Sequence, residues 1–281
     1  QCRDSRFPFP RPGQKHPVID SPRTDDDTQR LPNVALVLVE SIIDAGQEVQ
    51  LHLHPHWTGS READRSRTGR FHMHQYTLAE QIELLEGATD LLVAAGAPNP
   101  IAFRAGNYAA NDDTLTALGA TGFSYDSSHN GAHAEIDSRI SLPARRIAPS
   151  EETVVEVPVT VIEDAPGSLR TFQLCALSVG EMMAALEHAF EQDHAAVTIV
   201  SHGFELANRS GTSPNGVHVR RFEALCERLG DRAADLPTTH FMDRPTLTMD
   251  STDTPLAPDN LRTRWRQAEQ LWSNWVSERA A

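Results

Sequence analysis

The sequence predicts an α/β fold in which helices cover a mainly parallel sheet or barrel. Short apolar runs typical of strands alternate with helical segments at the spacing of βα units. The length of 281 residues suits one large domain and is common among α/β barrels. With 39% hydrophobic and 23% charged residues, the composition is that of a globular protein with a real core.

The N-terminal third is expected to contain an arm, a helix, a strand and a loop. Residues 1–32 are rich in proline and predict an irregular arm. The run NVALVLVESIIDA predicts a helix over 33–45, and Gly46 follows it as a stop signal. Alternating apolar and polar residues predict a strand at 48–53. The polar, arginine-rich residues 58–76 predict a long loop.

Capping boxes mark the starts of two later helices. Thr77 with Glu80 predicts a helix that runs to about residue 95, and Ser178 with Glu181 predicts one over 178–192. We expect three further helices, at residues 112–118, 217–229 and 260–278.

The remaining strands are expected to be short. We expect them at residues 101–104, 123–125, 154–162, 169–174, 196–201 and 238–242. Pro158 makes the run at 154–162 an edge strand or a bulged one, because proline cannot donate to a sheet. The run at 169–174 is its expected pairing partner.

Charge and apolar content exclude several classes of function. The net charge is −14, and no basic stripe with interleaved aromatic residues is present, so we expect no nucleic-acid partner. No apolar run is long enough to predict a membrane span. Cys2, Cys175 and Cys226 are far apart and suggest no disulfide framework, which favours a cytoplasmic location.

The segment EVQLHLHPHW carries three histidines at every second position, His52, His54 and His56. On an extended strand these side chains share one face. If the chain turns at Pro55, His52 and His56 converge instead. Neutral imidazoles are good ligands for Zn²⁺ and related divalent ions, so this segment predicts a metal site. The alternative is a group of surface or core histidines at a strand end.

Three more segments place polar residues near strand ends, where α/β proteins gather their chemistry. Arg104 and Tyr108 lie in FRAGNYAAN, Asp126 in GFSYDSSHN and His202 in TIVSHGFEL. Arg104 suits a carboxylate partner, Asp126 suits the orientation of a histidine, and His202 suits general acid chemistry. The alternatives are a solvated arginine in a turn, an aspartate that caps a turn and a histidine that merely ends a strand.

Taken in order, these segments resemble the polysaccharide deacetylase family, with its NodB-homology domains and carbohydrate esterase family 4. GQEVQLHLHPHW is similar to the segment that carries that family's metal histidines, which match His52 and His56 and leave His54 as a bystander or a supporting group. FRAGNY resembles its arginine segment, which matches Arg104 and Tyr108, with Gly106 in place of a proline.

The resemblance continues through YDSS, where Asp126 matches the aspartate that tunes the catalytic histidine, and IVSH, where His202 matches that histidine. It covers residues 33–245 and is tightest to bacterial members with an HPHW segment. It implies three parts: the arm at 1–32, a barrel domain at 33–245, and a linker with an amphipathic helix at 246–281.

The resemblance also implies a distorted TIM-type (β/α) barrel that lacks its first strand or strands in this chain. The family's first strand ends in an Asp-Asp pair, which supplies the catalytic base and the third metal ligand. Asp20 and Asp25–Asp27 lie too close to His52 in sequence to be that pair. We therefore expect the pair upstream of Gln1.

The implied function is metal-dependent removal of an acetyl group from an N-acetylated sugar or polysaccharide, in surface-polysaccharide metabolism. The implied cofactor is a divalent metal, zinc by preference. The alternative is a catalytically inactive, deacetylase-like module that binds glycans or a protein partner without the Asp-Asp pair. An amidase that acts on a non-sugar substrate is a third possibility.

In the implied mechanism, the Tyr108 backbone N–H stabilises the oxyanion and His202 protonates the leaving amine. Asp126 orients His202, and Arg104 holds the base aspartate. The sequence predicts no oligomeric state.

Overall fold

The computed structural model describes residues 25–55 and 70–277. Most of the expected arm, His56 and most of the loop at 58–76 lie outside these residues. The expected three-part division of the chain stays a prediction.

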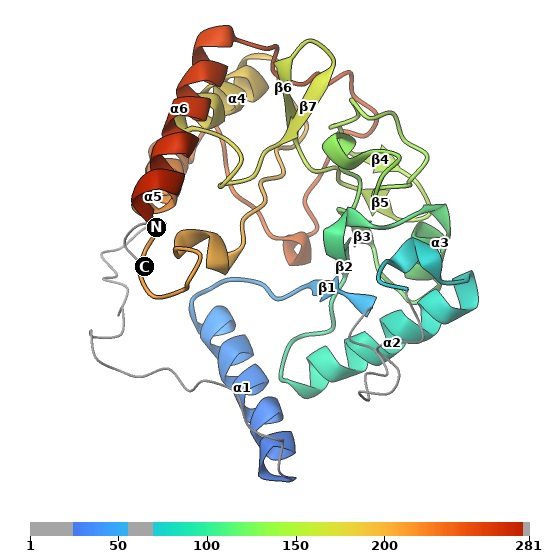
Figure 1. Ribbon diagram of the computed structural model, residues 1–281. Helices are drawn as coiled ribbons and strands as arrows, with labels where there is room; N and C mark the ends of the chain where they lie inside the picture. The colour runs from blue at the N-terminus through green and yellow to red at the C-terminus, as the bar shows by residue number, and fades with distance from the viewer. Residues whose placement is uncertain (1–24, 56–69, 278–281) are drawn as a thin grey trace.

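The centre of the fold is a five-stranded sheet (Figure 1). Its strands are β1 (Leu51–Leu53), β2 (Ala102–Ala105), β3 (Tyr125–Asp126), β4 (Ser150–Glu151) and β5 (Val155–Glu156), in the order β1-β2-β3-β5-β4. Every neighbouring pair is parallel except β4–β5. The predicted α/β class with a mainly parallel sheet is thus confirmed. The described strands form an open sheet, and closure into a barrel stays a prediction.

Six α-helices accompany the sheet in the described residues. They are α1 (Asp25–Asp44), α2 (Leu78–Ala94), α3 (Asp112–Ala120), α4 (Val179–Glu191), α5 (Gly216–Asp231) and α6 (Asn260–Ser277). Both predicted capping boxes are present: the Thr77 side chain accepts from the Glu80 N–H, and Ser178 does the same for Glu181. α1 begins at Asp25, so part of the expected arm is helical.

A separate hairpin follows the sheet, formed by β6 (Val161–Ala165) and β7 (Ser168–Thr171). Its antiparallel pairing confirms the expected partnership of the two runs. The expected strand at 154–162 is divided between β5 and β6, with Pro158 in the gap, because proline has no N–H for a ladder.

Two strand predictions are wrong. Residues 196–201 form no regular strand, although an isolated bridge joins Val200 to Gln173 and Thr198 accepts from the Thr160 N–H. Residues 238–242 contain no strand and run into the short 3-10 helix η6 (Phe241–Asp243). Apolar β-branched runs predict burial well, but they do not specify a continuous row of backbone partners.

Two large apolar clusters hold the molecule together. One joins the first strands to α2 and α3 through residues that include Leu51, Leu85, Phe103 and Leu118. The other joins the hairpin to α4 and α5 through Ile162, Phe172, Met182 and Leu225. The predicted site residues His52 and Arg104 lie on β1 and β2, which contribute to the first of these clusters.

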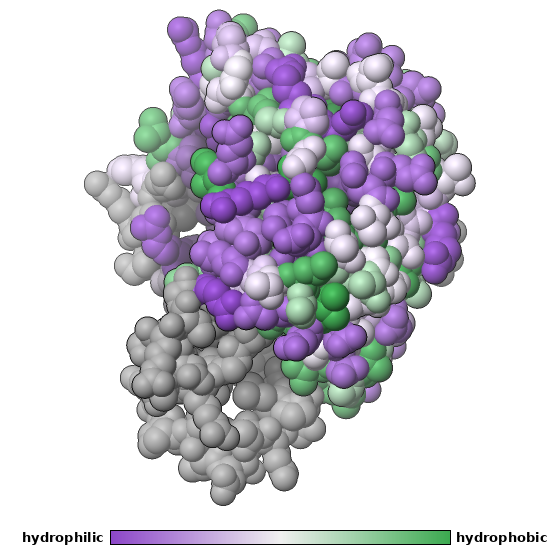
Figure 2. All heavy atoms as spheres, turned by 90° about the vertical axis from the view of Figure 1, so that its right-hand side faces the viewer, coloured by the Kyte–Doolittle hydropathy of each residue, from purple (hydrophilic) through white to green (hydrophobic). Residues whose placement is uncertain are grey.

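The face that Figure 2 shows is mostly hydrophilic, with hydrophobic residues in small groups, as the acidic composition leads one to expect. Among the described helices, none has both the length and the apolar character that a bilayer crossing requires.

Candidate functional site

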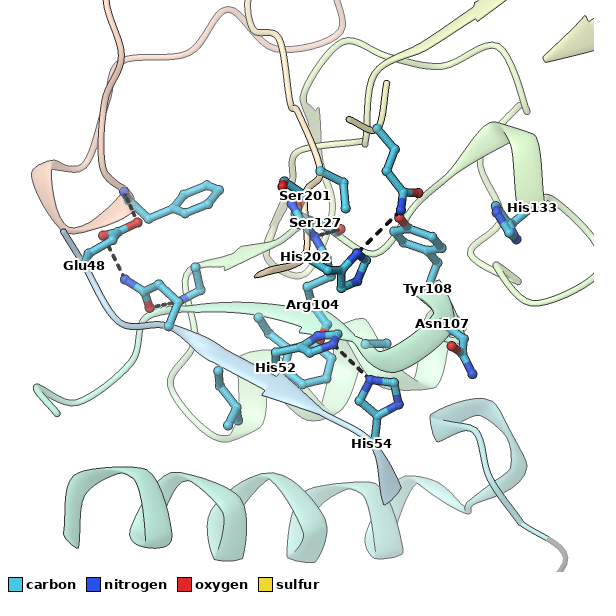
Figure 3. A pocket seen from close by; sticks show the side chains of 18 residues that line it. Glu48, His52, His54, Arg104, Asn107, Tyr108, Ser127, His133, Ser201 and His202 are labelled. Atoms are coloured by element: carbon cyan, nitrogen blue, oxygen red, sulfur yellow. Dashed lines mark hydrogen bonds between the residues drawn. The ribbon is translucent and has the colours of Figure 1, made fainter. Parts of the chain in front are cut away.

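A cleft of about 480 Å³ opens where the carboxyl ends of β1, β2 and β3 meet (Figure 3). Such edges are where parallel sheets place their sites. Four of the predicted residues line the cleft: His52, Arg104, Tyr108 and His202. The other described polar residues that line it are Glu48, Gln50, His54, Asn107, Ser127, His133, Gln173 and Ser201.

His52 lies on β1 and is held by the neighbouring strand. Its Nδ1 lies 2.8 Å from the carbonyl oxygen of Arg104, with which it pairs across the sheet. Because a carbonyl only accepts, Nδ1 carries the proton and Nε2 keeps its lone pair. Desolvation lowers the pKa of His52, and the nearby charges of Arg104 and His202 lower it further. The ring is therefore prepared as a neutral donor ligand.

His54 is the nearest imidazole to His52 among the described residues. The two Nε2 atoms lie 3.1 Å apart, and the rings meet edge to face (Figure 3). The strand stays extended, so residues two apart share one face. The resemblance left His54 as a bystander or a supporting group, whereas this distance makes it a candidate ligand beside His52. The role of His56 stays a prediction, because His56 lies outside the described residues.

Gly106 makes room for the His54 ring. A Cβ atom at position 106 would lie 2.4 Å from the Nδ1 atom of His54. No real contact is that short, so only glycine permits this ring position. The glycine at this position therefore has a local steric reason.

His202 follows the extended segment at 196–201, and Glu205 orients it. His202 Nδ1 lies 2.8 Å from Glu205 Oε1, and the Phe204 ring stacks on the imidazole at 4.9 Å. The side chain of His202 is 40% exposed, whereas that of Glu205 is 3% exposed. The carboxylate thus fixes the proton on Nδ1 and leaves Nε2 on the solvent side.

Glu205 is itself firmly held. It lies in the 3-10 helix η5 (Gly203–Leu206), and it accepts hydrogen bonds from Gln173 Nε2 and from the Cys175 N–H, the latter at 3.2 Å. Its carbonyl oxygen lies 2.7 Å from His218 Nδ1. A buried carboxylate with these partners is a rigid support rather than a surface charge.

The hydrogen bonds of Asp126 go to neighbours other than His202, which corrects the expectation that Asp126 orients that histidine. Asp126 is fully buried on β3 and accepts from the Ser128 hydroxyl at 2.7 Å and the Ser128 N–H at 3.2 Å. Across the strand pair it meets Glu156, with which it shares a hydrogen bond. Burial raises the pKa of both carboxyls, and the charge of Asp126 raises that of Glu156 further. This buried carboxyl pair links β3 to β5 next to the cleft.

Arg104 binds Ser127 through its guanidinium, and its predicted role toward a base aspartate stays a prediction. Nε donates to the Ser127 carbonyl and Nη2 to the Ser127 hydroxyl, each at 3.0 Å. Burial lowers the pKa of Arg104, yet an arginine stays charged in proteins. The side chain ties β2 to the end of β3, while its own carbonyl holds His52.

Tyr108 and Asn107 adopt left-handed backbone angles, with φ of 60° and 57°. Two consecutive non-glycine residues in this region cost of order 1 kcal/mol or more each, and such strain gathers at functional sites. The Tyr108 ring lies 5.1 Å from that of His133, at the opposite end of the cleft from Glu48 (Figure 3). Desolvation raises the pKa of Tyr108. Its predicted role toward an oxyanion stays a prediction.

Glu48 is the one carboxylate among the described lining residues. Its two oxygens accept from the N–H groups of Phe241 and Met242, at 2.9 and 3.0 Å. Gln50 donates to the same carboxylate and accepts from the N–H groups of Ile101 and Ala102. Glu48 and its partners lie at the end of the cleft opposite Tyr108 and His133 (Figure 3).

The donor atoms fit a divalent metal in part. A catalytic zinc site usually has three protein ligands. The described residues bring two imidazole nitrogens together, those of His52 and His54, with the proton of His52 held on the other nitrogen. Across residues 25–55 and 70–277, no group of three or more His, Cys, Asp or Glu side chains is arranged to hold a metal.

Reasoning from the sequence missed Glu205 and Gln173. Glu205 follows His202 at a spacing of three residues, which a single 3-10 turn can bring together, so a weak signal existed. Gln173 comes from a distant segment, and its approach depends on the bridge between residues 173 and 200.

Comparison with known proteins identifies no family for this chain. No family model matches the chain, and no curated protein matches it. Among solved structures, the chain is similar to a protein from Mycobacterium smegmatis whose name provisionally assigns it to the polysaccharide deacetylases. The identity is 20% over 82% of this chain and 73% of that one, and the TM-score is 0.47. A likeness this weak carries no argument about activity.

Proposed function

We propose that the protein is a metal-dependent hydrolase that removes the acetyl group from an N-acetylated sugar or polysaccharide. One observation carries the proposal: a pair of converging imidazoles, His52 and His54, shares a cleft with a third imidazole, His202, that a buried carboxylate supports. This combination provides ligand atoms and a proton donor around one space. The resemblance of the sequence segments to polysaccharide deacetylases supports the same reaction.

His52 and His54 would hold a divalent ion, zinc by preference, and His56 stays a predicted further ligand. The chemistry that such an ion supplies is polarisation of the acetyl carbonyl and a lower pKa for a bound water. The hydrogen bond from His52 Nδ1 to the Arg104 carbonyl keeps Nε2 directed toward the cleft. Arg104 is thus a positioning residue, which acts through its backbone.

His202 would donate a proton from Nε2 to the leaving amine. The Glu205 carboxylate lies 2.8 Å from Nδ1 and fixes the orientation of the ring. The stacked Phe204 ring restricts rotation of the imidazole. Together they hold the proton donor in one orientation before substrate arrives.

A second candidate function is a glycan-binding module that does not hydrolyse its ligand. The observation that favours it is the state of Glu48, the one carboxylate among the described lining residues. Both oxygens of Glu48 already accept from backbone N–H groups, so this carboxylate has a structural role at the end of the cleft. The aromatic and polar residues that line the cleft would suit a bound sugar, whether or not the protein hydrolyses it.

The test measures acetate release from N-acetylchitooligosaccharides by the full chain with added Zn²⁺. We expect measurable release, a loss of roughly 100-fold or more in kcat for His202→Ala, and a loss of roughly 10–100-fold for Glu205→Gln. His188→Ala on α4, remote from the cleft lining, is the matched control and should keep full activity.

Zinc content is measured in the same preparations and in His52→Ala and His54→Ala. We expect each of these two variants to lose bound zinc. Saturable oligosaccharide binding without acetate release would favour the glycan-binding module. Equal zinc content in the wild type and both histidine variants would refute the ligand assignment.

A further inference from the structure

Gln173 reaches the cleft from a segment whose backbone is held in place. It forms an isolated bridge with Val200, and the Leu174 N–H donates to the Val200 carbonyl at 3.1 Å. The neighbours Phe172 and Leu174 are fully buried in the apolar cluster that joins the hairpin to α4 and α5. Side chains alternate in direction along an extended segment, so Gln173 points away from that cluster and lines the cleft.

The nitrogen end of the Gln173 amide faces a buried carboxylate. Nε2 donates to Oε1 of Glu205, whose side chain is 3% exposed. The Cys175 N–H and His202 Nδ1 face the same carboxylate, at 3.2 and 2.8 Å. A carboxylate surrounded by such groups acts as an acceptor, so the nitrogen of the Gln173 amide, rather than its oxygen, must be directed at it.

The oxygen end of the same amide is left for the cleft. Gln173 lines the cleft, whereas Glu205 does not. With the nitrogen directed at Glu205, Oε1 is the terminal atom on the cleft side of the planar amide, and no described residue donates to it. Gln173 therefore carries a fixed acceptor at the surface of the cleft.

This acceptor lies next to the imidazole that we assign as the proton donor. Gln173 Nε2 is 3.5 Å from His202 Nδ1, so the amide and the ring are neighbours. When an acetamido group is hydrolysed, its C–N bond breaks and its nitrogen takes a proton. Before the reaction that nitrogen already carries one N–H. An acceptor beside His202 can hold this N–H and leave the lone pair that forms on the nitrogen directed at the proton donor.

We propose that Gln173 makes the cleft selective for N-acetyl over O-acetyl groups, by accepting a hydrogen bond from the acetamido N–H through Oε1. The inference rests on the proposed deacetylation and names the acyl linkage that the same site prefers. An ester has oxygen in place of N–H, so it leaves Oε1 without its donor and brings two acceptors together. Sites built to bind a substrate N–H discriminate strongly against analogues that lack it.

The test compares acetate release from N-acetylchitotriose and from cellotriose that carries O-acetyl groups at the corresponding positions. We expect Gln173→Met to lower the ratio of kcat/KM for the amide to kcat/KM for the ester by about tenfold or more. Gln173→Lys keeps a donor for Glu205 but has no acceptor, so it should lower the ratio as well. Both substrates are measured with one preparation, so a smaller folded fraction cancels in the ratio.

Gln192→Met is the matched control, because it makes the same chemical change at an exposed residue that ends α4. It should leave the ratio unchanged. An equal fall on both substrates in Gln173→Met would mean that Gln173 acts only through Glu205 and His202, and it would overturn the proposal. A hydrogen bond from a sugar hydroxyl to Oε1 would give the same equal fall, because both trisaccharides keep their other hydroxyl groups.

Binding gives a second readout that needs no turnover. Isothermal titration in a His202→Ala background, in which we expect hydrolysis to be slow, measures the affinity for each trisaccharide. We expect the amide to bind about tenfold more tightly than the ester, and Gln173→Met to remove this preference. If the wild type released acetate from neither substrate, the proposed function would fail while this preference still tested the role of Gln173. Equal affinities, or binding of neither trisaccharide, would overturn that role.

Discussion

At the scale of single residues, the position of the His54 ring depends on the absence of a side chain at Gly106. The ring rests where a side chain at position 106 would be, and its Nε2 lies 3.1 Å from that of His52. The proposed pair of metal ligands therefore depends on both an extended strand and a glycine on the adjacent segment. The histidine spacing was visible in the sequence, whereas the steric role of Gly106 required the structure.

Gly106→Ala is expected to displace the His54 ring, because the new Cβ would lie 2.4 Å from Nδ1. The two Nε2 atoms would separate, and we expect zinc affinity to fall at least tenfold, a loss of about 1.4 kcal/mol in binding free energy. Isothermal titration with Zn²⁺ measures this directly, without reference to activity.

Gly87→Ala is the matched control for that experiment. Gly87 lies in α2, and a Cβ there would meet nothing within 4 Å. Alanine in a helix should stabilise the protein by up to about 1 kcal/mol and leave zinc binding unchanged. If Gly106→Ala bound zinc as tightly as the wild type, His54 would not be a ligand.

At the scale of secondary structure, the sequence predicted helices better than strands. Capping boxes and helical periodicity are local signals, and α2 and α4 begin where Thr77 and Ser178 indicated. The segment at 196–201 was expected as a strand, yet its backbone partners come from the region of the hairpin through scattered contacts. Such partners are set by tertiary packing, which a window of sequence does not contain.

The buried carboxyl pair of Asp126 on β3 and Glu156 on β5 should make the free energy of unfolding depend on pH. Burial raises the pKa of Glu156, so the folded protein keeps a proton that the unfolded chain loses above about pH 4.3. The free energy of unfolding should therefore decrease as pH rises above that value. Glu156→Gln keeps an amide donor for Asp126 and an acceptor for the His129 N–H.

We expect Glu156→Gln to unfold at a temperature similar to that of the wild type at pH 5 and at a higher temperature at pH 8. Thermal denaturation at a series of pH values measures the difference. Glu152→Gln, a change at an exposed site nearby, should show no such trend. A gap that stays constant with pH would mean that Glu156 is ionised in the folded protein.

At the scale of the whole molecule, the cleft depends on contacts between segments far apart in the chain. Glu205 supports His202 only because Gln173 and the Cys175 N–H reach it from the segment before α4. Arg221 on α5 then ties the Cys175 carbonyl to Glu269 on α6. The sequence identified the histidine, but pairings over such distances depend on the complete fold. The C-terminal helix is thereby connected to the candidate site.

Substitution of Arg266 tests how much the attachment of α6 to the rest of the fold contributes to the free energy of unfolding. It is nearly buried, and it bridges Asp164 and Glu181, which are 9% and 2% exposed at their side chains. Removing one partner of a buried ion pair leaves uncompensated charge, so Arg266→Ala should lose about 3–5 kcal/mol in the free energy of unfolding. Urea denaturation measures this loss.

Arg264→Ala, on the exposed side of the same helix, is the matched control and should change stability by no more than about 0.5 kcal/mol. If α6 were held mainly by its apolar residues, the two variants would lose similar amounts. If instead the contacts of Arg266 with Glu181 and Asp164 hold α6, only Arg266→Ala should show the large loss. A loss confined to Arg266→Ala would show that the inward ion pairs attach α6 to the rest of the fold.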